Sequence, residues 1–273
     1  STLVKKCTSA IFFTSKAIGI ESFKMLLVAF AKKVKSKHNY FKEIIDTFKI
    51  LKSTDRKVQL LSENSKPIFS NSEIIIRSFS PNLETEIYLE PLYRKETKKF
   101  LTGNGIKVIT KGFNFQSIVI TIEIKGCKML FGADQEFHPT EPGIGWSAIN
   151  QLPYFKESKF SFFKVPHHGS ENGYNFSFWN EILASNAKLL TTPYSRSRLP
   201  RQEMITTIKS HGDFYITSYL GDRVYKKLPS LIKTKTRHLN IKRLAKRNSG
   251  VVHFTLNSKL SFDVELIPDA IML

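Results

Sequence analysis

Two amphipathic stretches near the start of the chain predict helices, and the first 55 residues are expected to be helical. Between Phe23 and Val34 apolar residues recur at intervals of three and four positions, and the lysines fall between them. A second stripe with the same spacing runs from Phe41 to Leu51. This spacing places apolar side chains along one face of a helix, so both helices are expected to pack against a core.

Strand-like patterns replace the helical spacing further along the chain. Short runs rich in β-branched and aliphatic residues occupy positions 58–61 and 74–76. They are bounded by Ser, Asn and Pro, as strands commonly are. The stretch 81–112 has mixed charge and no clear period, so it is expected to be mostly loop.

A β-hairpin is predicted next. Isoleucines stand at alternate positions of residues 118–124, and the pair Lys125-Gly126 is suited to a turn. The apolar run 127–131 then forms the return strand. Three residues later comes Asp134, so its carboxylate is expected just beyond a strand end.

A second apolar strand is predicted at residues 160–165, and it runs into the sequence Pro-His-His-Gly-Ser, which contains His167 and His168. Strands alternate with helices after this point, which indicates a layered α/β protein. The length allows one or two domains, and we expect a single domain over residues 1–273. The remaining predicted elements are a helix at 178–184, a strand at 188–191, a helix at 201–210, a strand at 214–217 and a closing hairpin over 251–266.

Composition agrees with a globular protein. Hydrophobic residues make up 41% of the chain and charged residues 24%, a balance that is typical of soluble domains rather than disordered ones. No apolar run reaches the roughly 20 residues of a membrane span, and no secretory signal is recognisable. The two cysteines form no CxxC pair, which argues against a disulfide framework and a zinc ribbon. A cytoplasmic location without a membrane partner is expected.

The formal net charge of +19 is the strongest compositional signal. Lysine and arginine neutralise phosphates, so nucleic acid or another phosphate-bearing partner is one interpretation. Lysine-rich codon usage combined with selection for solubility is the other. A basic insert at 222–247 holds ten basic residues against one acid, and it is either a phosphate-contacting arm or a solvated segment. The residues expected to contact nucleic acid are Lys233, Lys235, Arg237, Lys242, Arg243, Lys246 and Arg247.

Asp134, His167 and His168 are the candidate metal ligands and catalytic residues. A carboxylate at an open strand end is suited to bridging divalent ions, and neutral imidazole binds zinc, manganese or iron. Glu136 and His138 lie close enough in the sequence to contribute. The alternatives are ordinary: an Asp after a strand is commonly a turn or cap residue, and paired histidines are more often structural or exposed.

The flanking sequence and the order of the segments resemble the metallo-β-lactamase superfamily. The run MLFGAD at 129–134 and the run KVPHHGS at 164–170 are similar to segments of the branch that contains the C-terminal domain of ComEC-type competence proteins. The resemblance extends over about residues 58–266. It implies an αββα sandwich, a divalent metal (Zn²⁺, with Mn²⁺ as the alternative), a bridging role for Asp134 and a ligand role for His167 or His168.

Three departures from the family pattern qualify this resemblance. The HxHxDH loop that supplies most ligands is absent, since no two of the seven histidines are two positions apart. Ala133 stands where glycine is usual, and Leu199-Pro200 stands where many relatives have His-Pro. The fold is therefore expected to lack its first strands. The chain is either an N-terminally incomplete piece or a degenerate member.

Three functional hypotheses follow from the sequence. The first is a metal-dependent hydrolase that acts on a phosphodiester, in nucleic acid or a nucleotide, through metal-activated water. The second is a degenerate, non-catalytic module of the same fold that binds nucleic acid through the basic insert. The third is a half-domain whose site is completed by an N-terminal segment or a partner chain. The sequence alone leaves open whether the chain is an enzyme.

Overall fold

The computed structural model describes most of the chain. Its described residues are 2–33, 40–63, 66–102, 112–138, 140–194, 197–218, 226–227, 243–244, 250–267 and 270–272. None of the helices in these ranges has both the length and the apolar character needed to cross a membrane.

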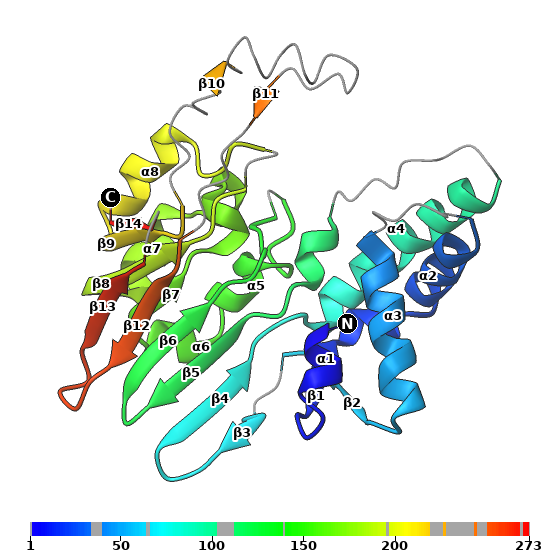
Figure 1. The fold of residues 1–273 in the computed structure, drawn as a ribbon, viewed down its shortest axis with the longest axis horizontal. Helices are drawn as coiled ribbons and strands as arrows, with labels where there is room; N and C mark the ends of the chain where they lie inside the picture. Colours follow the sequence, from blue (N-terminus) through cyan, green and yellow to red (C-terminus); the bar gives the residue numbers. More distant parts are fainter. Residues whose placement is uncertain are drawn as a thin grey trace.

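The described residues between 2 and 61 form a helical group with one small sheet (Figure 1). The two predicted helices are confirmed as α2 (Glu21–Lys33) and α3 (Tyr40–Ser53). The expectation of a purely helical start is wrong, because β1 (Phe12–Ser15) pairs in parallel with β2 (Val58–Leu61). Two short elements flank β1 and complete the group: α1 (Thr2–Lys6) and the 3₁₀ helix η1 (Lys16–Gly19).

The segment predicted as loop over 81–112 instead contains the 19-residue helix α4 (Leu83–Leu101). Asn82 caps its first turn, because the Asn82 side chain accepts a hydrogen bond from the backbone N–H of Thr85 at 3.0 Å. Pro91 lies inside the helix and obscured it in the sequence, since proline normally ends helices. Packing against α2 compensates: Phe23 and Tyr93 have ring centroids 4.8 Å apart.

An eight-stranded sheet forms the centre of the rest of the chain, in the order β14-β9-β8-β7-β6-β5-β4-β3. Strands β3 to β6 are antiparallel, β6 to β9 are parallel, and β14 returns antiparallel to β9. The predicted hairpin is confirmed as β5 and β6. The strands are β3 (Phe69–Ser70), β4 (Ile74–Ser78), β5 (Ile120–Ile124), β6 (Cys127–Phe131), β7 (Phe160–Lys164), β8 (Leu183–Thr191), β9 (Asp213–Ile216) and β14 (Ile271–Met272).

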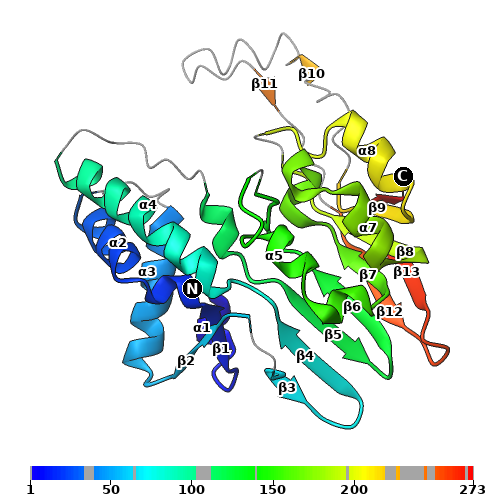
Figure 2. The ribbon, with the colours of Figure 1, turned by 180° about the vertical axis from the view of Figure 1, so that it is seen from behind.

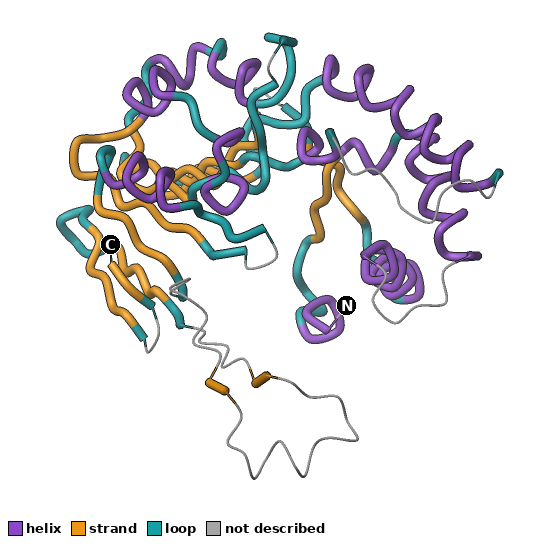
Figure 3. Tube along the Cα trace, turned by 90° about the horizontal axis from the view of Figure 1, so that it is seen from above, coloured by secondary structure: helices purple, strands orange, loops and turns teal. Residues whose placement is uncertain are grey.

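Helices cover one face of this sheet, as the view from behind shows (Figure 2). On the opposite face, the hairpin of β12 (Val252–Leu256) and β13 (Phe262–Leu266) packs over β7. The rings of Phe254 and Phe262 lie 5.0 Å and 5.7 Å from that of Phe162. Seen from above, the N-terminal helices lie beside the sheet (Figure 3). The covering helices are α5 (Trp146–Asn150), α6 (Pro153–Lys156), α7 (Phe176–Ile182) and α8 (Gln202–Lys209).

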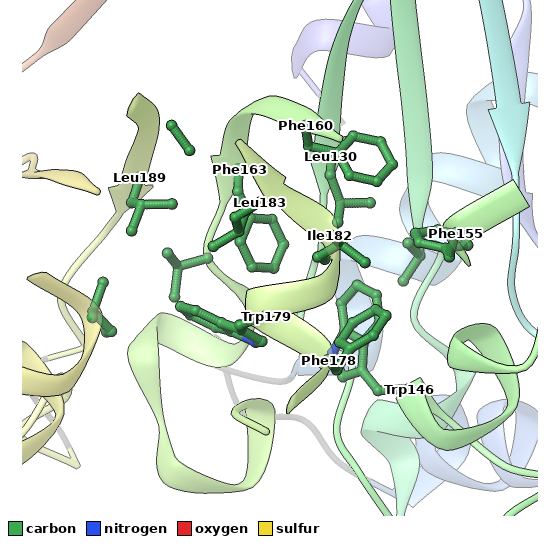
Figure 4. Close-up of a cluster of buried hydrophobic side chains, with 14 of the residues drawn as sticks. Leu130, Trp146, Phe155, Phe160, Phe163, Phe178, Trp179, Ile182, Leu183 and Leu189 are labelled. Carbon is green, nitrogen blue, oxygen red and sulfur yellow. The ribbon is translucent and has the colours of Figure 1, made fainter. Parts of the chain in front are cut away.

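The main hydrophobic core lies between the sheet and these covering helices (Figure 4). Leu130 and Phe163 point into it from β6 and β7, and Trp146, Phe178 and Trp179 meet them from the helices. All five side chains are fully buried. A separate core holds the N-terminal helices against α4.

The predicted α/β class is confirmed by this mixed sheet with helices on one face. An αββα sandwich requires a second sheet over the other face, and the described residues place only the β12–β13 hairpin there. The specific sandwich therefore stays a proposal.

Candidate metal site at the strand ends

Three neighbouring parallel strands deliver the candidate residues to one edge of the sheet. Because β6, β7 and β8 are parallel, the segments that follow them leave at the same edge. Asp134 follows β6, His167 and His168 follow β7, and Thr192 follows β8. The structure brings Asp134 and the histidine pair close together: the backbone N–H of His167 donates to the carbonyl of Ala133 at 2.9 Å.

The backbone of both loops is left-handed at the residues beside the candidate ligands. Ala133, His167 and His168 have φ of 46°, 45° and 55°. Residues other than glycine rarely adopt this backbone conformation, and strained residues of this kind cluster at functional sites. Gly169 continues the turn with φ of 73°, and a Cβ there would lie 2.9 Å from Pro200 Cβ. Gly132 is similarly required, because its Cβ would lie 2.9 Å from Pro166 Cβ.

His168 faces Asp134 with a defined tautomer. Its Nδ1 lies 2.8 Å from the carbonyl oxygen of Thr192, and a carbonyl can only accept, so the proton is on Nδ1. The ring stacks on Tyr194 with centroids 5.1 Å apart. Nε2 of His168 is then 3.8 Å from Oδ1 of Asp134, too far for a hydrogen bond. When the His168 ring is neutral, Nε2 carries a lone pair and lies near the Asp134 carboxylate. A cation between these two groups would stabilise this arrangement.

The His167 ring contacts a different set of residues from the His168 ring. Its Nδ1 donates to Oε1 of Glu136 and to Oδ1 of Asn172, each at 3.0 Å. Asn114 donates to the same Glu136 oxygen at 2.6 Å, and its amide nitrogen also lies 3.3 Å from Nε2 of His167. Both ring nitrogens of His167 are thus engaged by protein groups. The adjacent histidines have separate environments, and His168 is the one that pairs with Asp134.

The Glu136–His167 pair is electrostatically coupled. The hydrogen bond with Glu136 raises the pKa of His167 above its ordinary value, against the opposing effect of burial. Burial by itself raises the pKa of Glu136, but the hydrogen bonds from His167 and Asn114 outweigh it, and the net pKa is lowered. The charged forms of both groups are therefore favoured together.

Lys164, the last residue of β7, brings a positive charge to the same edge. Burial lowers the pKa of its ammonium group, and the negative charge of Asp134 partly offsets this.

His138 is held away from this pair. Its Nδ1 accepts from the backbone N–H of Glu141 at 3.0 Å and of Thr140 at 3.3 Å, and its Nε2 contacts the hydroxyl of Tyr88 at 3.3 Å. Nδ1 has partners in the loop and Nε2 has one in α4, so the suggested contribution of His138 to a metal site finds no support in its contacts. Glu136 contributes through His167.

The donor set fits one metal ion in part. Zinc–ligand distances of about 2.0–2.2 Å and a tetrahedral angle separate N and O ligand atoms by about 3.4 Å. The 3.8 Å between His168 and Asp134 is slightly wider than this. Within the described ranges, no group of three or more His, Cys, Asp and Glu side chains is arranged to hold a metal. Catalytic zinc takes three protein ligands, and this pair supplies two.

Several residues of this edge were missed by sequence reasoning. Asn114 lies in the 3₁₀ helix η2 (Phe113–Gln116), 22 positions before Glu136, and nothing in its local sequence marks it. Asn172 follows the histidine turn closely, and its proximity to His167 was the only available signal. Of the basic residues predicted to contact nucleic acid, Arg243 falls in the short strand β11 (Arg243–Leu244), which pairs with β10 (Lys226–Lys227). The other six lie outside the described residues: Lys233, Lys235, Arg237, Lys242, Lys246 and Arg247.

Comparison of the chain with protein-family models, with curated proteins and with solved structures found no match.

Proposed function

We propose that this chain is a metal-dependent hydrolase of the metallo-β-lactamase fold, an αββα sandwich, and that it acts on phosphodiesters in nucleic acids or nucleotides. One observation carries the proposal: Nε2 of His168 lies 3.8 Å from Oδ1 of Asp134, beyond hydrogen-bond distance. A divalent cation, Zn²⁺ or Mn²⁺, satisfies both groups at once.

The surroundings of His168 support a ligand role. Metal-bound histidines usually donate their second ring N–H to a carbonyl or carboxylate, which fixes the tautomer and the ring direction. Thr192 supplies this carbonyl at 2.8 Å, and Tyr194 holds the ring plane by stacking. The side chain of Asp134 is 49% exposed and that of His168 is 27% exposed, so both are open to an ion and a substrate from solvent.

A divalent ion bound here would activate water as a nucleophile and offset negative charge on a phosphoryl group. Asp134 and His168 would hold the ion, and the Lys164 ammonium group lies close enough to Asp134 for their charges to attract each other. Because two protein donors are fewer than a catalytic site requires, we assign the remaining ligands to an N-terminal segment or to a partner chain. The substrate class rests on the net charge of +19, which favours a polyanion.

Metal analysis of the purified chain tests the proposal. We expect the chain alone to bind zinc or manganese weakly through its two donors, with at least a tenfold loss of affinity in Asp134→Ala and in His168→Ala. His253→Ala and Asp263→Ala are matched controls on the exposed hairpin. Metal-dependent cleavage of bis(p-nitrophenyl) phosphate should fall in the same two site variants. A chain that binds no metal, or one whose cleavage survives Asp134→Ala, contradicts the hydrolase.

The second candidate is a non-catalytic nucleic-acid-binding module. The charge of the basic insert 222–247 favours it, because ten basic residues accompany one acid. Binding of a DNA duplex by a chain that holds no metal would support this candidate over the hydrolase.

A further inference from the structure

We propose that Glu136 is a positioning residue, which holds His167 and so fixes the turn that aims Nε2 of His168 at Asp134. The proposal rests on the proposed metal site. It adds the hydrogen-bond network around Glu136 and His167, which lies outside the pair of candidate ligands. Glu136 comes two residues after Asp134, and His167 comes one residue before His168. The contact between Glu136 and His167 therefore links the loop that carries Asp134 to the loop that carries His168.

The turn needs such support because its conformation is unfavourable. A left-handed residue other than glycine costs about 1–2 kcal/mol relative to the right-handed form. His167 and His168 are consecutive residues of this kind, and Ala133 faces them across the loop. Such conformations persist only where the surroundings fix them. A relaxed turn would move the His168 ring away from Asp134.

Side-chain contacts to His167 provide this support. Glu136 and Asn172 together occupy its Nδ1 at 3.0 Å. The backbone of His167 is also held, because its N–H donates to Ala133 and its carbonyl accepts from Ser170 at 3.0 Å. The Glu136 side chain is 16% exposed, so its bonds are protected from competition with water.

Asn114 connects the same network to the N-terminal helices. Its amide donates to Glu136 at 2.6 Å. Two residues on, Gln116 accepts a hydrogen bond from the hydroxyl of Tyr93 in α4 at 2.8 Å. Phe113 of the same 3₁₀ helix packs on Tyr93 with centroids 5.1 Å apart. Glu136 is thus anchored between α4 and the strand ends, and loss of its carboxylate disconnects both sides.

Three variants test the role: Glu136→Ala, the conservative Glu136→Gln, and the exposed control Glu171→Ala. Outer-shell partners of metal ligands typically contribute about 10–100-fold to affinity. We expect a loss of zinc affinity in this range for Glu136→Ala, a smaller loss for Glu136→Gln, which keeps an acceptor for His167, and none for Glu171→Ala. Isothermal titration with zinc alone measures each affinity.

A second readout uses the metal-free chain. Long-range ¹H–¹⁵N spectra report the tautomer of each histidine ring, and the wild type should show the proton of His168 on Nδ1. The His168 ring should lose this single tautomer in Glu136→Ala and keep it in Glu136→Gln. If Glu136→Ala lowers only thermal stability and keeps both the tautomer and the zinc affinity, the positioning role is wrong. If the wild type binds no zinc, the metal proposal fails, and the tautomers still decide this one.

The variant Asn114→Ala covers the case in which Glu136→Ala does not fold. It leaves the Glu136–His167 bond in place and removes one of the donors to Glu136, so we expect partial loss of the His168 tautomer. An unchanged tautomer in a folded Asn114→Ala chain would also contradict the network.

Discussion

The backbone N–H of His167 donates to the carbonyl of Ala133 at 2.9 Å, and both residues are left-handed. This bond joins the loop after β6 to the loop after β7. A second bond, from the N–H of Gly132 to the carbonyl of Lys164 at 3.1 Å, extends the strand pairing up to that point. The two loops therefore fix each other, and the position of one candidate ligand depends on the other.

We expect Gly169→Ala to destabilise the protein strongly. The residue has φ of 73°, and a Cβ would lie 2.9 Å from Pro200 Cβ and 3.2 Å from Ile208 Cδ1. Backbone strain costs about 1–2 kcal/mol, and the overpacking adds about 1–3 kcal/mol. Denaturant unfolding measures the sum as a loss of the free energy of unfolding.

Gly126→Ala is a matched control for this prediction. Gly126 also has positive φ, at 88°, but no atom lies within 4 Å of its added Cβ. It should lose only the backbone contribution of about 1–2 kcal/mol. Equal losses in the two variants would show that the contact between Gly169 and Pro200 is not tight.

Much of this edge was predictable because strand ends are marked by local patterns. Alternating isoleucines located β5, and the apolar run before Asp134 located β6. The position of each candidate ligand followed, since a residue just beyond a buried strand must lie at the sheet edge. The different environments of His167 and His168 were not predictable, because they arise from contacts with residues distant in sequence, such as Asn114 and Thr192.

Two elements escaped prediction because tertiary contacts stabilise them against their local sequence. Helix α4 contains Pro91 and has a weak apolar stripe, so its stability depends on packing against α2. Strand β1 has four residues and exists through its pairing with β2, 46 positions further on in register. Neither pairing partner is visible in a local pattern.

The Glu136–His167 pair should make stability depend on pH. The pKa of Glu136 is lowered from 4.5, so its contribution is present above that pH and is lost as pH falls through the folded pKa. The pKa of His167 is raised from 6.5, so its contribution is complete below that pH and is lost as pH rises through the folded pKa. The pair is most stabilising between about pH 4.5 and 6.5.

Glu136→Gln checks this dependence. The wild type should exceed the variant in free energy of unfolding by about 1.5–3 kcal/mol within that window, as expected for a hydrogen bond between charged groups. The difference should shrink at pH 9 and at pH 3. Unfolding curves at five pH values measure it, and a difference that is constant with pH would exclude a charged pair.

We expect Lys164→Met to raise stability. Burial lowers the pKa of this ammonium group, which means that the fold penalises its charge, and Asp134 compensates only in part. An apolar side chain of similar length removes the penalty, and the gain at pH 7 should be about 1 kcal/mol. The exposed Lys156→Met is the control and should change little. A clear loss of stability in Lys164→Met would mean that the Lys164 charge has a stabilising partner at this edge.

If the basic insert 222–247 is a phosphate-contacting arm, it should determine the salt dependence of DNA binding. Each phosphate neutralised on duplex DNA contributes about −0.9 to the slope of log K against log salt. Replacing four of its basic residues by Gln should flatten the slope by up to about 3.6. The residues changed are Lys233, Lys235, Arg237 and Lys242.

A charge-matched control separates this local effect from the net charge. The control replaces four exposed lysines elsewhere by Gln, at Lys5, Lys6, Lys156 and Lys259. Both variants lower the formal charge from +19 by the same amount, so a general field effect weakens them equally. Phosphate contacts by the insert flatten only the slope of the insert variant. Equal slopes would identify the insert as a solvated surface and would remove its support for a nucleic-acid substrate.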